Sequence, residues 1–482
     1  MPLYDVFFFV VIFFFVGIFL ASFISHLLII ALTSLFLGAL FLFLGYFKKN
    51  KKLLWVSGLI IFIVIGAFYY FWDDRKIQKT NLIFNQTANF SGVIIDAERG
   101  LSQKLIVNLL APQKGLVLIK TKQYPSFQYG DLINFEGVAE KTDKSSYDNY
   151  LRKDRIVAVM DYPQISFIKN NQGNFIKAKL LILKDKIIEI FQRIFSSEKA
   201  AFLSGITLGE RGEFSKNFKE AMSKSGTTHL VALSGYNISI IICLVFSLFL
   251  SFFALGRRLA FFLSILVIIG FVIMTGGEAS VIRAAVMGVI ALLAKETGRI
   301  YSFRNALAAA AFVLLIKNPK LLVFDAGFQL SFLAVIGLIY LSPIIKNLLH
   351  FKKESLFDWQ DNFSSTLSAQ IMVAPLLISY FSNFSIISLL ANLLILSVIP
   401  LTMILGFITA FVGFVFFPLA VILGWFLDIF LSYEIFLIKF FGKLNFFNIS
   451  SISFLTVVIY YVVLFIFIYF NTRKSAFINK NF

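Results

Sequence analysis

Apolar residues fall in long runs near both ends of this chain, and these runs predict membrane-spanning helices. A span needs about 20 mainly apolar residues to cross a hydrocarbon core about 30 Å thick. The predicted spans cover residues 5–24, 27–46, 53–72, 229–254, 259–275, 279–297, 303–317, 327–345, 364–381, 384–400, 401–417, 419–440 and 453–471. The pattern therefore predicts a polytopic α-helical membrane protein with about 11–13 transmembrane helices, because one of the late segments is expected to be re-entrant or merged with a neighbour.

The stretch between residues 73 and 228 contains no run long enough to span. Its first part is rich in β-branched residues and is divided by Gly, Pro, Asn and Lys, which is typical of short strands. The predicted strands are "TANFSGVIID", "SQKLIVNLL", "GLVLIKTK", "DLINFEGVAE" and "RIVAVMD". Five short strands favour a small closed β-barrel of the OB type, with a β-sandwich as the alternative.

The residues after Phe175 predict amphipathic helices with Lys and Arg on their polar faces. The chain then divides into N-terminal spans (1–72), an OB-like β domain (73–170), an amphipathic helical linker (171–228) and a transmembrane domain (229–482). The basic loop of residues 48–52 is expected in the cytoplasm. The β domain and the helical linker are then expected on the opposite, extracytoplasmic side of the membrane.

Composition agrees with a membrane protein and adds a charge argument. Hydrophobic residues make up 59% of the 482 residues and charged residues 15%, against about 25% charged in soluble domains. The formal net charge is +18. Residues 73–228 carry 24 Lys and Arg against 17 Asp and Glu. This basic surplus lies on the predicted extracytoplasmic side, where the positive-inside rule does not explain it.

Several kinds of chemistry are excluded by what the sequence lacks. Cys243 is the single cysteine, and the three histidines show no HxH or HExxH spacing, so neither a disulfide framework nor a metal site is expected. The phosphate-binding pattern of ATPases does not occur either. No metal and no cofactor are therefore predicted.

Polar side chains interrupt four of the apolar runs, where lipid makes them costly. The candidate residues are His229, Ser234, Gly235, Asn237, Glu278, Arg283, Asp325, Gln329, Ser331, Gln370 and Asn392. They either line a wet path through the bundle or form hydrogen bonds that hold helices together. Glu278 and Arg283 are five residues apart, so they point to different sides of a helix and do not form an i,i+4 pair.

A hydrolase based on Ser234 and His229 is a third interpretation. The five-residue spacing is poor for contact on a helix, the GxSxG turn is absent, and no acid is placed to orient the histidine. We therefore expect no catalytic residue. Capping of the incoming helix by Thr227, Thr228 or Ser234 is the structural alternative.

The motifs together resemble those of ComEC-type competence proteins, which take up DNA in natural transformation. The similarity lies in "FLSGITLGERGEFSKNFKEAMSKSG", "GTTHLVALSGYNISII", "SVIRAAVM", "NPKLLVFDAGFQLSFLAVIGL" and "APLLISYFSNFSIISLLANLL", which follow one another in the family's order. The resemblance is specific over about residues 196–400 and looser over the N-terminal spans and the β segment.

Two departures from the family pattern matter. Asn237 stands where the family has histidine, so a role that needs an imidazole is in doubt there, although an amide still donates and accepts hydrogen bonds. Longer members also carry a metallo-β-lactamase-like domain thought to degrade the strand that is not transported, whereas this sequence has no HxHxDH cluster. A separate nuclease is therefore expected.

The resemblance implies a membrane channel that conducts single-stranded DNA across the bacterial cytoplasmic membrane. A separate DNA receptor and a cytoplasmic ATP-driven motor are expected as partners besides the nuclease and membrane lipid, and a homo-oligomer is left open. Candidate DNA-binding residues of the β domain are Lys120, Lys122, Tyr124, Phe127 and Tyr129, with ordinary loop packing as the alternative. The competing function is a secondary transporter of a small anionic solute, which would use the same buried charges.

Overall fold

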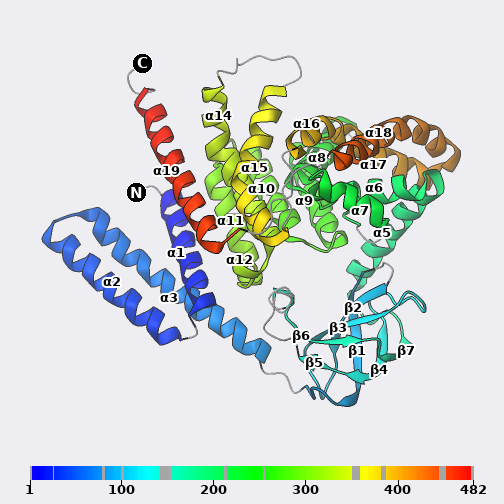
Figure 1. Cartoon of the computed structure of the whole chain (residues 1–482), viewed down its shortest axis with the longest axis horizontal. Coiled ribbons are helices and arrows are strands. Elements are labelled where there is room, and N and C mark those ends of the chain that lie inside the picture. The colour runs from blue at the N-terminus through cyan, green and yellow to red at the C-terminus, as the bar shows by residue number, and fades with distance from the viewer. Residues whose placement is uncertain are drawn as a thin grey trace. The chain divides into compact units, whose positions relative to one another are not determined.

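The structure is a computed structural model of the chain. It describes residues 3–24, 26–78, 82–98, 102–141, 151, 153–210, 214–252, 256–349, 359–381, 387–444 and 452–478. The chain forms two compact units, which are residues 1–182 with 286–325, and residues 183–285 with 326–482. Figure 1 shows the helices and the separate β-sheet of the chain.

The first unit begins with three long helices, α1 (Leu3–Phe23), α2 (Leu27–Phe47) and α3 (Lys51–Gln78). Helix α3 packs on both α1 and α2, and α11 (Phe303–Lys317) packs on α1 beside the short α12 (Leu321–Phe324). Glycines bring α1 and α3 close together. A Cβ at Gly17 would lie 2.0 Å from the Ile63 carbonyl oxygen, and one at Gly66 would lie 2.2 Å from that of Phe14. Small residues at a helix contact are typical of membrane bundles.

The β domain of the first unit contains all five predicted strands and two more. The strands are β1 (Thr87–Glu98), β2 (Ser102–Leu109), β3 (Leu116–Lys122), β4 (Leu132–Val138), β5 (Glu140–Lys141), β6 (Ile156–Asp161) and β7 (Gln164–Lys169). Hydrogen bonds join them in the order β5-β6-β3-β2-β1-β4-β7, and β3 with β6 is the parallel pair. In the described residues the sheet is open rather than closed, so the prediction of a closed five-stranded barrel is not met.

The two faces of this sheet bury different clusters. Alternate residues of β1 to β4, such as Phe90, Leu105 and Ile133, form the main core. On the opposite face Leu118 lies in a second, smaller cluster with Leu151 and Ile156. Because side chains alternate along a strand, both faces of β3 are therefore partly covered.

The second unit is helical throughout its described residues. Its elements are the C-terminal part of α5 (Phe175–Ile194), α6 (Ser197–Leu208), α7 (Lys216–Lys224), η1 (Thr228–Leu230), α8 (Gly235–Ser247), η2 (Leu248–Phe252), α9 (Arg257–Met274), the start of α10 (Ala279–Thr297), α13 (Ala326–Ile336), η3 (Gly337–Leu341), α14 (Ser342–Leu348), α15 (Trp359–Phe381), α16 (Ser388–Leu396), α17 (Ile399–Val415), α18 (Phe417–Lys443) and α19 (Phe454–Ile478).

The number of spans is smaller than the sequence predicts. Within the described residues, nine helices are long and apolar enough to cross a membrane, or ten if the bent pair α16 and α17 counts as one span. Helix α11 has 15 residues and is about 22 Å long at 1.5 Å per residue, which is short of the hydrocarbon thickness. Helix α10 carries Arg283, Lys295 and Glu296 within 19 residues. The 46° bend between α16 and α17 marks a broken span or a re-entrant loop.

Helix α6 differs from the predicted amphipathic linker. Every residue from Ala200 to Leu208 is buried, and α6 packs against α17 and α18. A helix that is apolar on all sides belongs in a core, not at an interface. The amphipathic pattern does hold for α7, where Phe218 and Met222 are buried and the Lys residues are exposed.

Candidate functional site

The site begins where the chain enters α8. Ser234 is the N-cap of this helix, and its hydroxyl accepts a hydrogen bond from the Asn237 backbone N–H at 3.4 Å and donates one to Asn237 Oδ1 at 3.0 Å. Asn237 Nδ2 in turn donates to the Ile206 carbonyl of α6 at 3.1 Å. Asn237 is buried, so its amide joins α8 to α6 and satisfies both of its own polar ends. An asparagine is well suited to this position, because it donates and accepts at the same time.

The first turn of α10 approaches this helix start. The Ser280 hydroxyl donates to the Leu233 carbonyl at 2.8 Å. Arg283, one turn further on, places its guanidinium against Gly235, where a Cβ would lie 2.5 Å from Nη2. Arg283 Nη1 donates to the backbone carbonyl of Ser331 in α13. The structure thus brings together Gly235, Arg283 and Ser331, which come from three separate sequence motifs.

Arg283 is a buried cation, with 5% of its surface exposed. The ring of Phe332 lies 5.9 Å from the guanidinium carbon, which gives a weak cation–π contact. Among the described residues, no carboxylate lies within ion-pair distance of it. One carbonyl and one ring satisfy only part of a group with five N–H donors, so the remaining donors are free to meet an anion.

The other predicted polar residues form hydrogen bonds between helices. The Tyr380 hydroxyl of α15 donates to Gln329 Oε1 of α13 at 2.7 Å, and Gln370 Nε2 of α15 donates to the Ser388 hydroxyl of α16 at 3.1 Å. Asn392 is buried on α16, and its Oδ1 has no hydrogen-bond partner. Hydrogen bonding between helices therefore accounts for Gln329 and Gln370. That any of these side chains lines a conducting path stays a prediction.

Three candidates are placed differently from this group. His229 lies in η1, exposed, with Nδ1 3.2 Å from the Gly226 carbonyl. Glu278 is exposed at the start of α10. Asp325 is buried at the end of α12 and forms an ion pair of 3.3 Å with Lys153 of the β domain.

That ion pair belongs to a cluster that the sequence analysis missed. We define the ionic cluster as Asp73, Asp74, Lys153, Arg155, Lys320 and Asp325. Arg155 bonds Asp73 at 2.7 Å, and Lys320 bonds Asp74 at 2.6 Å. The cluster ties the end of α3 to the β domain and to α12. The two adjacent acids directly after the third span were the available signal, but their partners are 80 or more residues away in the chain.

The candidate DNA-binding residues of the β domain fall into two groups. Phe127 is in the main core, so its ring is not open to a base. Tyr129 packs on Gly173, accepts from the Asn174 N–H and lies under the Lys177 ammonium at 4.4 Å. Burial lowers the pKa of Lys177, and Asp96 acts against this shift. Packing within the protein therefore accounts for both aromatic rings.

The remaining three lie at the surface. Lys120 pairs with Asp161 at 3.0 Å. Lys122 and Tyr124 are exposed at the end of β3 and in the loop after it, and 76% of the Tyr124 surface is accessible. A cation beside an open aromatic face is what a single strand needs for phosphate contact and base stacking.

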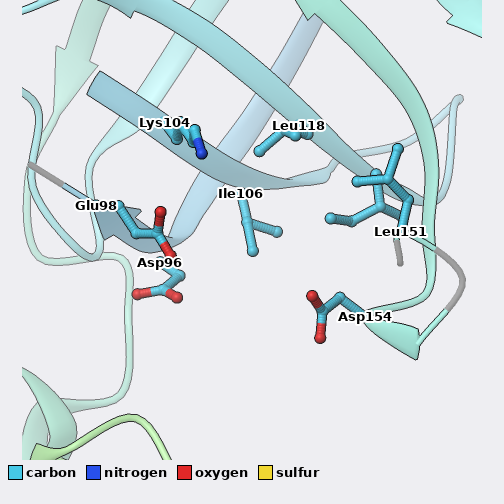
Figure 2. Close-up of a pocket in the computed structure, with 8 residues that line it drawn as sticks. Asp96, Glu98, Lys104, Ile106, Leu118, Leu151 and Asp154 are labelled. Carbon is cyan, nitrogen blue, oxygen red and sulfur yellow. The ribbon is translucent and has the colours of Figure 1, made fainter. Parts of the chain in front are cut away.

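A cavity of about 430 Å³ lies on the face of the same sheet that carries the smaller cluster around Leu118, Leu151 and Ile156. Figure 2 shows three carboxylates at this cavity, Asp96, Glu98 and Asp154, with Lys104 on the neighbouring strand. Burial raises the pKa of Asp154; Lys153 opposes the shift, and Asp325, Asp96 and Glu98 add to it. The described residues contain no group of three or more acidic, His or Cys side chains that could hold a metal ion. The negative charge makes this cavity unfavourable for a phosphate.

Comparison with known proteins identifies the family. The family model described as "Competence protein" matches residues 206–474, which is more than half of the chain. The chain belongs to the competence protein family. The match covers every element from α7 to α18 and so includes Gly235, Arg283 and Ser331, which we call the Arg283 group.

A curated relative of this competence protein is ComE operon protein 3 of Bacillus subtilis (strain 168). The two are 26% identical over 378 residues, which is 75% of this chain and 46% of the relative. The chain thus spans about half the length of the curated relative that it matches. No solved structure matches this competence protein.

Proposed function

We propose that this competence protein conducts single-stranded DNA across the bacterial cytoplasmic membrane, and that the Arg283 group meets the phosphates of the strand on its way. One observation carries the proposal: Arg283 is buried in the helical bundle without a carboxylate partner among the described residues. Leaving a cation uncompensated in a low-dielectric region is costly. A passing phosphate offsets that cost, and the planar fork of arginine suits phosphate oxygens.

The β domain would receive the strand. We propose that its core of strands is OB-like, a fold that is often only partly closed. Lys122 and Tyr124 would provide the first contact. Residues 73–170 carry 14 Lys and Arg against 11 Asp and Glu, so the basic surplus of the segment is shared with the following helices. The binding is therefore expected to be weak and local.

The wider assembly follows from the same proposal. A channel with no ATP-binding motif needs a cytoplasmic motor, and a double-stranded donor needs a receptor and a nuclease to yield one strand. These partners, and a homo-oligomeric state, are proposals that co-purification with the full chain can test.

Substitution of Arg283 tests the central claim. We expect Arg283→Gln to reduce transformation by at least about tenfold, since loss of one charged contact of about 1.4 kcal/mol already costs that factor. Arg283→Lys should recover part of the activity, because it keeps the charge but not the fork. Arg258→Gln, at an exposed arginine in the first turn of α9, is the matched control. Membrane insertion of each variant is checked by protease protection, and full transformation by an inserted Arg283→Gln protein would refute the role.

Strand binding separates this function from a transporter of a small anion, which also needs a buried cation. The full chain in detergent should bind a labelled single strand with an affinity that falls steeply as salt rises. The double variant Lys122→Glu and Tyr124→Ala should weaken this binding, whereas Lys169→Glu, at an exposed lysine of β7, should change it less. Absence of any strand binding, together with loss of small-anion flux in Arg283→Gln, would favour the transporter.

A further inference from the structure

Glu434 is a buried carboxyl group in the second unit that the proposed DNA path does not use. It lies on α18, a helix apolar and long enough to cross the membrane, and its exposed fraction is 0%. The Thr402 hydroxyl of α17 lies 2.7 Å from Glu434 Oε1, and Oε2 has no hydrogen-bond partner. An ionised carboxylate in this position would leave half of its charge unsatisfied in a low-dielectric core, which is costly.

The helices packed on α18 supply no cation for this carboxyl. These are α6, α7, α16, α17 and the end of α5, which packs on Gly424. The cation at this end of α5, Arg193, lies over the ring of Phe417 at the first turn of α18, 17 residues before Glu434. Helices α16 and α17 carry no charged side chain. On α6, Lys199 pairs with Asp428 and Glu198 pairs with Lys439, so both pairs between α6 and α18 are complete without Glu434.

The charges of α7 and the end of α18 lie at the surface. Helix α7 carries Lys216, Lys219, Glu220 and Lys224, and all four are exposed, as is Lys443. Helix α7 contacts α18 through Ala221 against Gly442 and through the Phe218 ring, which lies 6.0 Å from the Lys439 ammonium. Glu434 therefore faces apolar groups and the one hydroxyl of Thr402.

We propose that Glu434 is a proton-binding site of the helical bundle, neutral while α17 and α18 are packed and ionised only when they separate enough to admit water. The hydrogen bonds fit a neutral acid. Thr402 Oγ1 also lies 3.4 Å from the Val398 carbonyl, so it can donate there and accept the proton of Glu434 Oε1. Oε2 is then a neutral carbonyl oxygen, for which the absence of a partner costs far less than for a carboxylate.

This site links proton release to opening of the bundle, whatever solute the protein carries. In the packed state the proton is held, and ionisation requires water to enter the interface between α17 and α18. A proton taken up from one side would favour repacking, so the proton concentration would shift the balance between packed and separated states. The inference goes beyond DNA conduction and does not depend on it.

Infrared spectroscopy of the full chain in lipid nanodiscs tests the site. At neutral pH the wild-type protein should show the carbonyl band of an un-ionised carboxylic acid, shifted to lower frequency in D₂O. Glu434→Gln should lose this band, and Asp428→Asn should keep it, because Asp428 is ion-paired and its side chain is 43% exposed. Thr402→Val should keep the band but move it to higher frequency, since one hydrogen bond to the acid is gone.

The outcomes are distinct. Identical spectra of wild-type and Glu434→Gln protein in this region would overturn the proposal. If Glu434→Gln does not insert, an unmoved band in Thr402→Val would overturn it as well. A band that disappears from the wild type on addition of sodium at constant pH would show that a metal cation occupies the site and not a proton, which also overturns it. None of these results bears on strand binding by the β domain.

Discussion

Substitution of Gly235 by alanine tests whether the position of the Arg283 guanidinium matters, separately from its charge. A Cβ at residue 235 would lie 2.5 Å from Arg283 Nη2 and 3.7 Å from the Ala284 Cβ. Ordinary van der Waals contact begins near 3.4 Å, so the guanidinium must move by about 1 Å. Because Arg283 is buried and bonded to the Ser331 carbonyl, it cannot swing into solvent.

The expected magnitude follows from two opposing effects. Displacement weakens or breaks the charged hydrogen bond to the Ser331 carbonyl, worth about 1.5–3 kcal/mol. Alanine favours the helix over glycine by up to about 1 kcal/mol, and by less at the first helical position, where residue 235 lies. We therefore expect Gly235→Ala to destabilise the folded protein by about 1–2 kcal/mol.

The assay is thermal unfolding of the full chain in detergent, with transformation frequency measured in parallel. Gly58→Ala is the matched control, since a Cβ there meets nothing within 4 Å and lies inside α3, so it should stabilise slightly. The Gly235→Ala protein should unfold at a lower temperature than wild type and transform poorly although its charge is unchanged. Wild-type unfolding and wild-type transformation by this variant would refute the tight placement of Arg283.

Further predictions concern the first unit. Arg155→Ala leaves the buried Asp73 carboxylate without its guanidinium and should lower the free energy of unfolding by about 2 kcal/mol, less than for a fully buried pair because Arg155 is 39% exposed. Lys120→Ala, which breaks the exposed pair with Asp161, should cost less than about 1 kcal/mol in the same unfolding assay. Burial raises the folded-state pKa of Asp154, so the folded protein binds more protons than the unfolded chain, and stability should fall as pH rises from the ordinary carboxyl pKa through the raised value. Asp154→Asn should remove this pH dependence and stabilise the protein at neutral pH; an unchanged pH profile of unfolding would contradict this explanation.

Local sequence patterns predict the elements of this protein well where a strand buries one face or where a helix is a long apolar run. The five main strands are predicted because their burial alternates, as in β2, whereas β7 was missed because its residues are almost all exposed. Apolar runs of about 20 residues identify the long spans. These runs predict too many spans where a run is short, as in α11, or carries charges, as in α10. Hydropathy alone does not measure the length of a helix or the partners of its charged residues.

The candidate site is predictable only in part, since its residues meet across long sequence distances. The cost of polar groups in lipid singles out Arg283 and Asn237, and the capping preference of serine explains Ser234. Nothing in the sequence indicates that Arg283 would bond a backbone carbonyl of α13 or that Asn237 would reach Ile206. Glu434 was overlooked because the two acids of α18, Asp428 and Glu434, give no periodic signal in a long apolar helix. Only the structure shows that Asp428 has a cationic partner and Glu434 has none among the described residues.

The ionic cluster has a mechanical consequence. Two side-chain pairs fasten the β domain, Arg155 with Asp73 of α3 and Lys153 with Asp325 at the end of α12, so the domain does not hang from a single tether. A third pair, Lys320 with Asp74, joins α12 to α3. A load applied to that domain is transmitted directly into the helices of its unit. Because each pair has a largely buried partner, salt screens these contacts only weakly, and the attachment should persist at high ionic strength.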